Sequence, residues 1–302
     1  MYDFGAKHVL DAILARPALK ELVLVMQRGE SLGTGTKKDD LPDAEVAQKL
    51  SDKFGKKFHF GWVKLGIKNG WVANSYHIKV AVRDSKAFWL SSGNWQSSNQ
   101  PEAGLLTGSN DFSYLKDYNR EWHAVVEHEE LAKTFEAYLR NDLKKGSSPD
   151  FVEAIAELPN IAVPVLETRR RGFGPGIKYF EPLDVNEVVK VTPLLTPDNY
   201  FDAAIELVKS AESEILLQNQ TFNAPAEHQD KLAELVGLLR EKQRRIPVRI
   251  VFRILMESDA RRNLEALVDM GFDPEQLRVQ TNLHTKGIIV DEIGRASCRE
   301  RV

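Results

Sequence analysis

A pattern of histidine, lysine and aspartate occurs twice in this chain and constrains its fold more than any other feature. Residues 76–84 read YHIKVAVRD, and residues 283–291 read LHTKGIIVD. Both contain His-x-Lys-x-x-x-x-Asp, formed by His77, Lys79 and Asp84 in the first copy and by His284, Lys286 and Asp291 in the second. With seven histidines in 302 residues, two chance matches are far rarer than one. The chain therefore contains two related halves.

The residues around each motif predict a β-strand that runs into a turn. A β-branched run lies between lysine and aspartate, VAV in the first copy and IIV in the second. Side chains alternate between the two faces of a strand, so a histidine and a lysine two positions apart point the same way. An imidazole beside an ammonium group suits a bound phosphate.

The order of predicted elements indicates an α/β protein. Apolar β-rich segments alternate with amphipathic helical segments, which favours mainly parallel sheets covered by helices. We expect a first lobe over residues 1–145, a linker over 146–187 and a second lobe over 188–291. The last residues, 292–302, carry no apolar period and are interpreted as a tail foreign to the fold.

The two halves are unequal, which predicts a chain trimmed at both ends. The first half has no counterpart of the strand and helix predicted over residues 191–217. The second half stops at Asp291, where further strands are expected. We therefore expect the first strand and helix of the first lobe, and the last strands of the second, to be missing.

Polar residues after the first motif are candidates for the same site. The segment SSGNW follows at residues 91–95, and parity places Ser92 and Asn94 on one strand face. Trp95 could roof a pocket there, so Ser92 and Trp95 are candidates for substrate binding. Glu121 lies at the start of the strand predicted over HAVVE, residues 123–127.

Composition limits the classes of function. The net charge of −3 gives no general attraction to polyanions. Cys298 is the single cysteine, so neither an intrachain disulfide nor a cysteine metal cluster can form. No histidine or carboxylate cluster has a recognisable ligand spacing, so we expect no metal and no cofactor. The sequence has no run of 18 apolar residues and no signal-peptide pattern, and it leaves compartment and oligomeric state open.

These motifs resemble those of the phospholipase D superfamily, whose members carry two His-x-Lys-x(4)-Asp motifs. The resemblance covers about residues 22–291. SSGN is similar to the family's Gly-Ser-x-Asn element, with Ser91 in place of glycine, and Asn-x-Glu of NREW resembles its acidic position. The resemblance implies two similar α/β/α lobes, each with a mainly parallel, mixed sheet, and a site where both motifs meet. It also implies phosphodiester cleavage without a metal.

The chemistry needed for such a cleavage agrees with these residue types. Lys79 and Lys286 can neutralise the charge on the non-bridging oxygens, and the Asn94 amide can donate hydrogen bonds to them. One imidazole attacks phosphorus to form a phosphohistidine, and the other protonates the leaving oxygen. The resemblance favours His77 as nucleophile and His284 as acid.

The carboxylates of the pattern have other predicted roles. Glu121 is the candidate to bind the far nitrogen of an imidazole, where it would fix the tautomer. Asp84 and Asp291 lie too far along strand and turn to carry protons. We interpret both as structural residues that tie the turn to a neighbouring charge or backbone amide.

The substrate class has more than one reading. The near-neutral charge, together with Trp71, Trp89, Trp95 and Trp122 near the first motif, favours a phospholipid or another small diester. A nuclease acting on a nucleic-acid backbone is the alternative, although it would more often show a broad basic face. A catalytically inactive binding module or fragment of the same fold is the second alternative.

Overall fold

The fold is taken from a computed structural model of the whole chain. The structure describes residues 1, 3–17, 19–27, 40–63, 65, 75–100, 119, 121–146, 188, 190–196, 198–220, 225, 229–253, 257–280 and 283–291. The side chains of residues 257–260 and 263 are outside this description. The predicted tail at 292–302, and the predicted linker at 146–187 apart from Gly146, also fall outside it.

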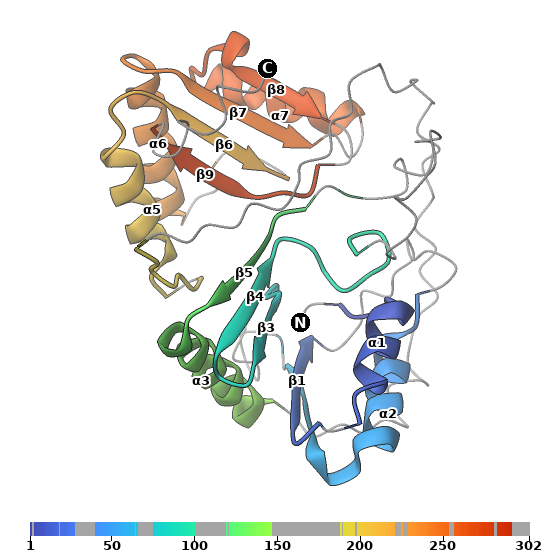
Figure 1. Cartoon of the computed structure of the whole chain (residues 1–302). Helices are drawn as coiled ribbons and strands as arrows, with labels where there is room; N and C mark the ends of the chain where they lie inside the picture. The colour runs from blue at the N-terminus through green and yellow to red at the C-terminus, as the bar shows by residue number, and fades with distance from the viewer. Residues whose placement is uncertain are drawn as a thin grey trace, which may run out of the picture.

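The second lobe is built on one four-stranded mixed sheet, drawn at the top of Figure 1. Its order is β8-β7-β6-β9, in which β6, β7 and β8 are parallel and β9 is antiparallel to β6. The strands are β6 (Ile215–Asn219), β7 (Val248–Arg253), β8 (Leu277–Gln280) and β9 (Gly287–Val290). The helices are α5 (Tyr200–Lys209), α6 (Asp230–Gln243), α7 (Glu257–Asp269) and the short η3 (Pro274–Gln276).

Alternation along these strands builds the core of the second lobe. In β7, Val248, Ile250 and Phe252 are fully buried and pack with apolar residues of α5 and α6. The residues between them, such as Arg249 and Val251, point to the opposite face. One face of this sheet is therefore a helix-covered core.

The first lobe contains two smaller sheets in the described residues. A parallel pair joins β1 (Leu22–Gln27) to β2 (Phe58–Val63). An antiparallel sheet has the order β3-β4-β5, from β3 (Val80–Arg83), β4 (Ala87–Ser91) and β5 (His123–Glu127). The helices are α1 (Lys7–Leu14), α2 (Asp43–Phe54), η1 (Gly55–Lys57) and α3 (Glu129–Lys145).

The two lobes share an order of elements but differ in how their strands pair. β1, β2 and β3 occupy the places of β7, β8 and β9 in the order of elements, and in the second lobe β6 lies between β7 and β9. No strand joins β1 to β3 in the described part of the first lobe. Met1 lies alongside β1, where the amide of Gln27 donates to the Met1 carbonyl at 3.3 Å.

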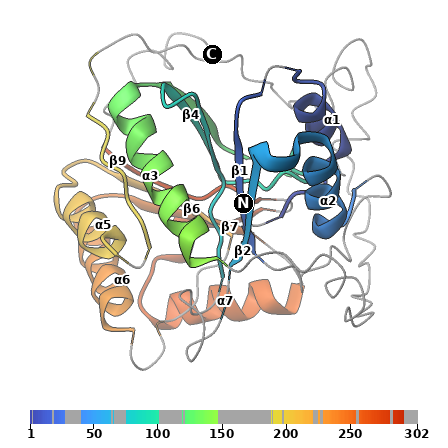
Figure 2. The same ribbon diagram turned by 90° about the horizontal axis from the view of Figure 1, so that it is seen from below.

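Helix α3 holds the two small sheets together (Figure 2). It packs against β1 and β2 as well as β3 and β4. Phe135 of α3 packs with Val80 and Phe88 of the antiparallel sheet, and Leu143 packs with Val25 and Val63 of the parallel pair. The helices α1 and α2 cover the other face of β1.

The predicted fold class of two α/β lobes is confirmed. One detail is corrected: β4 ends at Ser91, so Ser92 and Asn94 do not lie on a common strand face. The amide of Gly93 donates to the Ser91 hydroxyl at 2.8 Å, which turns the chain out of the strand. Across the described residues, no helix has the length and apolarity needed to span a membrane.

Candidate active site

The two motifs adopt the same local geometry. His77 and Lys79 immediately precede β3, and His284 and Lys286 immediately precede β9. The Lys79 ammonium donates to the carbonyl of His77 at 3.1 Å, and the Lys286 ammonium donates to the carbonyl of His284 at 2.6 Å. Each lysine thus folds back on its own histidine, which holds the ammonium group near the imidazole.

An ion pair joins the two lobes at this site. Glu121, just before β5 of the first lobe, approaches the Nδ1 atom of His284 in the second lobe at 2.7 Å. The side chains are 12% and 1% exposed for His284 and Glu121. A carboxylate can only accept, so Nδ1 carries the hydrogen, and the nearby Lys286 ammonium at 3.2 Å does not donate to it. Nε2 is then the ring nitrogen of His284 that Glu121 does not engage.

Three groups hold the Glu121 carboxylate in place. The Ser92 hydroxyl donates to Oε2 at 2.6 Å, and the Asn99 amide donates to Oε1. A Cβ atom at Gly93 would lie 2.8 Å from the Glu121 side chain, so the absence of a side chain at Gly93 allows this approach. Burial opposes ionisation of Glu121, but the hydrogen bonds from His284, Ser92 and Asn99 outweigh it and lower its pKa.

Ser92 binds Glu121, whereas the sequence analysis expected it to bind substrate. The sequence pattern placed it with the substrate, whereas its hydroxyl proton is used by Glu121 and its oxygen accepts from the Trp122 amide at 3.0 Å. Asn99 was missed by the sequence analysis. It lies in a polar stretch, and nothing in its spacing distinguishes it from its neighbours.

Asn94 lies beside the site in a buried position. The residue is 6% exposed, and its Nδ2 atom donates to Gln96 at 3.3 Å. The Oδ1 atom is enclosed without a hydrogen-bond partner in the described part of the chain. The Oδ1 atom can only accept, so an anionic ligand would bind the second hydrogen of Nδ2.

Trp95 lies in the core of the first lobe rather than over a pocket. Its ring meets Phe4 edge to face with centroids 4.8 Å apart and lies 5.7 Å from Trp89. Its carbonyl accepts from the amides of Gly5 and Ala6. This packing ties the N-terminal residues to the loop that carries Asn94.

Charged groups of both motifs act on His77. Desolvation by surrounding residues, followed by the charges of Lys79 and Lys286, lowers the pKa of His77 far below its usual range, although the residue keeps contact with solvent. His284 contributes in the same direction, and Glu121 opposes it. Groups from both motifs therefore share one electrostatic environment, in which His77 is neutral at pH 7.

Both lysines are held in surroundings that disfavour their charge. Burial, then the neighbouring charge of Lys286, lowers the pKa of Lys79 to about 7. Burial also lowers the pKa of Lys286 to about 8, where Glu121 opposes the effect and Arg253 adds to it. A bound anion would relieve this strain because it compensates both charges.

Replacing Lys79 by methionine is expected to stabilise the protein at pH 7, with a rise in Tm of about 2–8 °C. The folded-state pKa lies below the value of 10.5 for the unfolded chain, so charging Lys79 opposes folding. This cost is fully present below pH 7 and disappears as pH rises toward 10.5. Thermal unfolding at pH 7 and pH 9.5 measures it, and the difference from wild type should shrink at the higher pH.

The exposed Lys49 provides the control for this comparison, because its ammonium pairs with Glu45 on the surface of α2. Lys49→Met should change Tm by less than about 2 °C at both pH values. A Lys79→Met variant less stable than wild type at pH 7 would contradict the electrostatic cost.

The two motif aspartates lie at turns with left-handed backbone conformation. Asp84 has φ +52° and Asp291 has φ +56°. The Asp291 carboxylate accepts from the amides of Glu212, Ser213 and Glu214, and these bonds lower its pKa to about 2. Asp291 thus ties the end of β9 to the turn before β6. Asp84 lies in the β3–β4 turn, where the adjacent Ser85 hydroxyl donates to Glu136 of α3.

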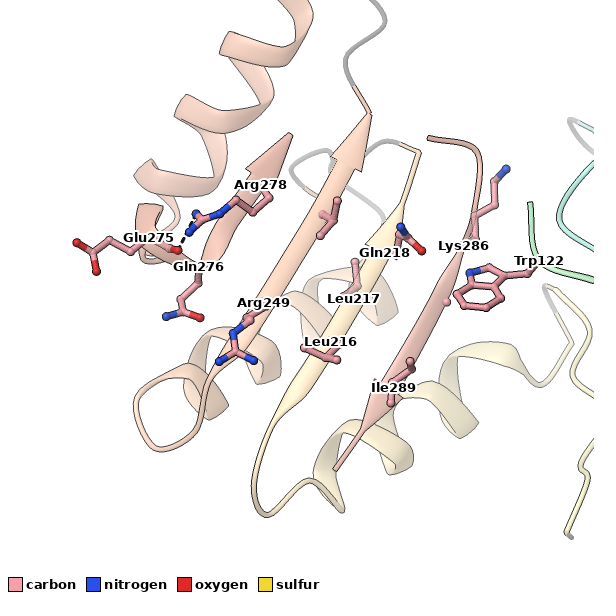
Figure 3. Close-up of a pocket in the computed structure, with 12 residues that line it drawn as sticks. Trp122, Leu216, Leu217, Gln218, Arg249, Glu275, Gln276, Arg278, Lys286 and Ile289 are labelled. Carbon is pink, nitrogen blue, oxygen red and sulfur yellow. Dashed lines mark hydrogen bonds between the residues drawn. The ribbon is translucent and has the colours of Figure 1, made fainter. Parts of the chain in front are cut away.

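A large pocket adjoins Lys286 on the sheet face opposite the helices (Figure 3). Its volume is about 980 Å³. Lys286, Trp122 and Gln218 lie at one end, and Arg249, Arg278 and Glu275 lie at the other. Leu216, Val251 and Ile289 contribute apolar side chains to the lining. In the first lobe, the corresponding face of β1 and β2 is covered by α3.

Comparisons with known proteins give structural likeness alone. No protein-family model matches the sequence, and no curated protein matches it. The crystal structure of phosphatidylserine synthase from Haemophilus influenzae Rd KW20 superposes with a TM-score of 0.54 and 15% identity, covering 96% of this chain and 68% of that one. Polyphosphate kinase from Porphyromonas gingivalis has a TM-score of 0.40 and 10% identity, covering 93% of this chain and 35% of that one. This similarity is too low to indicate a shared fold. The first likeness shows the fold.

Proposed function

The chain has the fold of the phospholipase D superfamily, and from that premise we propose that it is a phosphoryl-transfer enzyme that cleaves phosphodiesters through a phosphohistidine. The observation that carries the proposal is the contact of Glu121 with His284 across the lobes, beside a neutral His77. This arrangement supplies one nucleophilic imidazole and one imidazole whose cationic form has a carboxylate partner. Such a pair divides the work of a nucleophile and an acid.

In the first step, a ring nitrogen of His77 attacks phosphorus. A nitrogen–phosphorus bond forms, and the bond from phosphorus to the leaving oxygen breaks. His284 donates its Nε2 proton to that oxygen, and Glu121 holds the opposite side of the ring. Lys79, Lys286 and the Asn94 amide stabilise the charge on the non-bridging oxygens.

In the second step, water attacks the phosphohistidine. Neutral His284 takes a proton from the water, the oxygen–phosphorus bond forms, and the nitrogen–phosphorus bond to His77 breaks. The products are an alcohol and a phosphomonoester, and both histidines return to their starting states. An alcohol in place of water would give transfer rather than hydrolysis by the same steps.

A phospholipid or another small diester is the substrate class that we favour. The pocket beside Lys286 offers apolar lining residues against which an apolar substituent of the diester could lie. The net charge of −3 gives no broad attraction to nucleic acid, so a nuclease is the alternative. In the first lobe, α3 covers the corresponding sheet face. A helix packed on this face of the second lobe would occupy the pocket in place of a substrate.

Hydrolysis of bis(4-nitrophenyl) phosphate in the presence of a chelator tests the reaction. We expect release of 4-nitrophenolate at a rate that the chelator does not change, because the proposed steps use side chains of this chain alone. Phosphatidylcholine vesicles and single-stranded DNA, assayed in parallel, test the substrate class. Faster cleavage of DNA than of the lipid would replace the favoured class by the nuclease. Activity abolished by the chelator would contradict the mechanism.

A further inference from the structure

Arg253 adds a third cation, after Lys79 and Lys286, to the site where the two motifs meet, which we call the cleft. It is the last residue of β7, at the carboxyl end of the parallel strands, where open α/β sheets place ligands. Its neighbours on β7 are Phe252, which is buried against the helices, and Val251, which faces the pocket. Strand alternation gives Arg253 the same face as Val251. This is the face on which Lys286 lies.

Strand register places Arg253 near Lys286. Asn219 of β6 pairs with Phe252, and the Arg253 amide donates to the carbonyl of Gln220 at 3.1 Å. On the other side of β6, Gly287 pairs with Gln218, and Lys286 is one residue further toward the same edge. Arg253 and Lys286 therefore flank the end of a single strand. The two charges act on each other, since Arg253 lowers the pKa of Lys286.

The guanidinium of Arg253 is only partly satisfied by the protein. Its Nε atom is enclosed without a hydrogen-bond partner in the described residues. Two arginines of the same sheet face are satisfied differently. Arg249 pairs with Glu214 at 3.0 Å, and Arg278 donates to the carbonyls of Glu275 and Leu277 at 2.8 Å. An enclosed donor without a partner is unfavourable, so the Arg253 guanidinium would be stabilised by an anionic partner.

The internal repeat shows that the charge at this position is specific to the second lobe. β1 and β7 are both six residues long, and Gln27 ends β1 as Arg253 ends β7. The Gln27 side chain is buried and accepts from the Tyr76 amide at 2.8 Å, directly before His77. The first lobe uses the position to hold the backbone of its motif. The second lobe presents a guanidinium there.

The positive side chains at the cleft outnumber the negative charges that Glu121 and a simple phosphodiester would supply. Lys79, Lys286 and Arg253 all interact with the Glu121 carboxylate. Lys79 also interacts with Asp3, but burial raises the pKa of Asp3 to about 8, so this carboxyl is mostly neutral at pH 7. A phosphodiester carries one negative charge. We infer that Arg253 determines specificity by binding a second anionic group of the substrate, a phosphate or a carboxylate, next to the phosphodiester that the two lysines hold. The inference rests on the proposed function and names the substrate class of the same site.

Binding of inorganic pyrophosphate and inorganic phosphate, measured by calorimetry, tests Arg253 without turnover. Arg253→Gln should weaken pyrophosphate binding about 10- to 100-fold, the range expected for a lost charge-assisted hydrogen bond, and phosphate binding less than about 3-fold. Arg253→Lys should recover part of the difference. Arg244→Gln, an exposed arginine after α6, is the matched control and should change neither. Equal loss for both anions, or no loss, would overturn the inference.

Kinetics with matched substrates separates the two sources of the second anion. 4-Nitrophenyl ethyl phosphate carries one charge, 4-nitrophenyl carboxymethyl phosphate adds a carboxylate, and a 4-nitrophenyl alkyl diphosphate adds a phosphate. Arg253→Gln should raise KM about 10- to 100-fold for the carboxylate or the diphosphate substrate, with KM for the ethyl ester nearly unchanged. A parallel rise for all three would overturn the inference. If wild type cleaves none of them, the proposed function fails, and the binding experiment still decides the role of Arg253.

Discussion

Replacing His77 by alanine is expected to reduce turnover of bis(4-nitrophenyl) phosphate by at least about 10⁴-fold, because no phosphohistidine can form without the ring. Replacing His284 by alanine should have a different effect. 4-Nitrophenolate leaves without protonation, so this variant should still form the intermediate and then fail to activate water. Stopped-flow measurement should therefore show a burst of about one equivalent of 4-nitrophenolate, followed by very slow turnover.

The intermediate can be identified by its chemistry, since a phosphorus–nitrogen bond is labile to acid and stable to base. Mass spectrometry of the quenched His284→Ala variant should locate the modification on His77. His59→Ala is the matched control, because His59 is a surface histidine near Glu21 and should turn over as wild type does. A burst in His77→Ala and none in His284→Ala would reverse the two assignments. Full activity in both variants would remove the histidines from the mechanism.

Glu121→Gln is expected to reduce turnover by about 10²- to 10⁴-fold. The amide keeps the size of the side chain but cannot stabilise the imidazolium form of His284 as a carboxylate does. The loss should depend on the leaving group. An alkyl phosphodiester needs a proton on the departing oxygen, so its loss should lie near the upper end of the range. For the 4-nitrophenyl ester, which needs none in the first step, we expect the lower end.

Glu127→Gln controls for the general effect of removing a carboxylate from this strand region. Glu127 is exposed at the end of β5 and pairs with Arg83 at 3.4 Å. We expect activity within about two-fold of wild type and unchanged stability. Equal losses for alkyl and 4-nitrophenyl substrates in Glu121→Gln would indicate that Glu121 maintains the fold of the cleft and does not support proton transfer.

The sequence predicted the fold class because the alternation of strands and helices depends on short-range periodicity, whereas the meeting of the two motifs was expected from the family resemblance. A histidine and a lysine two residues apart on an extended segment share a face in any sheet. The carboxylate of Glu121 was selected by its place after the first motif. Its partner in the other lobe, by contrast, depends on how the lobes pack, and a single sequence does not encode that in a local pattern.

Other features of the cleft depend on tertiary contacts that the sequence could not reveal. Ser92 and Asn99 hold Glu121, although both lie in a polar stretch with no regular spacing. Arg253 ends an alternating strand, which is also a common place for a solvated charge. Trp95 packs into the first core because the N-terminal residues fold back onto it. Its neighbours are distant in sequence, so no local pattern predicts the contact.

The two lobes have separate apolar cores, and the proposed catalytic groups are divided between them. One core is formed by α5, α6 and the four-stranded sheet, and the others lie within the first lobe. A small relative movement of the lobes would separate Glu121 from His284 while the apolar cores of both lobes stay intact. Activity should then be lost under mild denaturation before the lobes unfold, because separating the catalytic groups costs less free energy than unfolding either lobe.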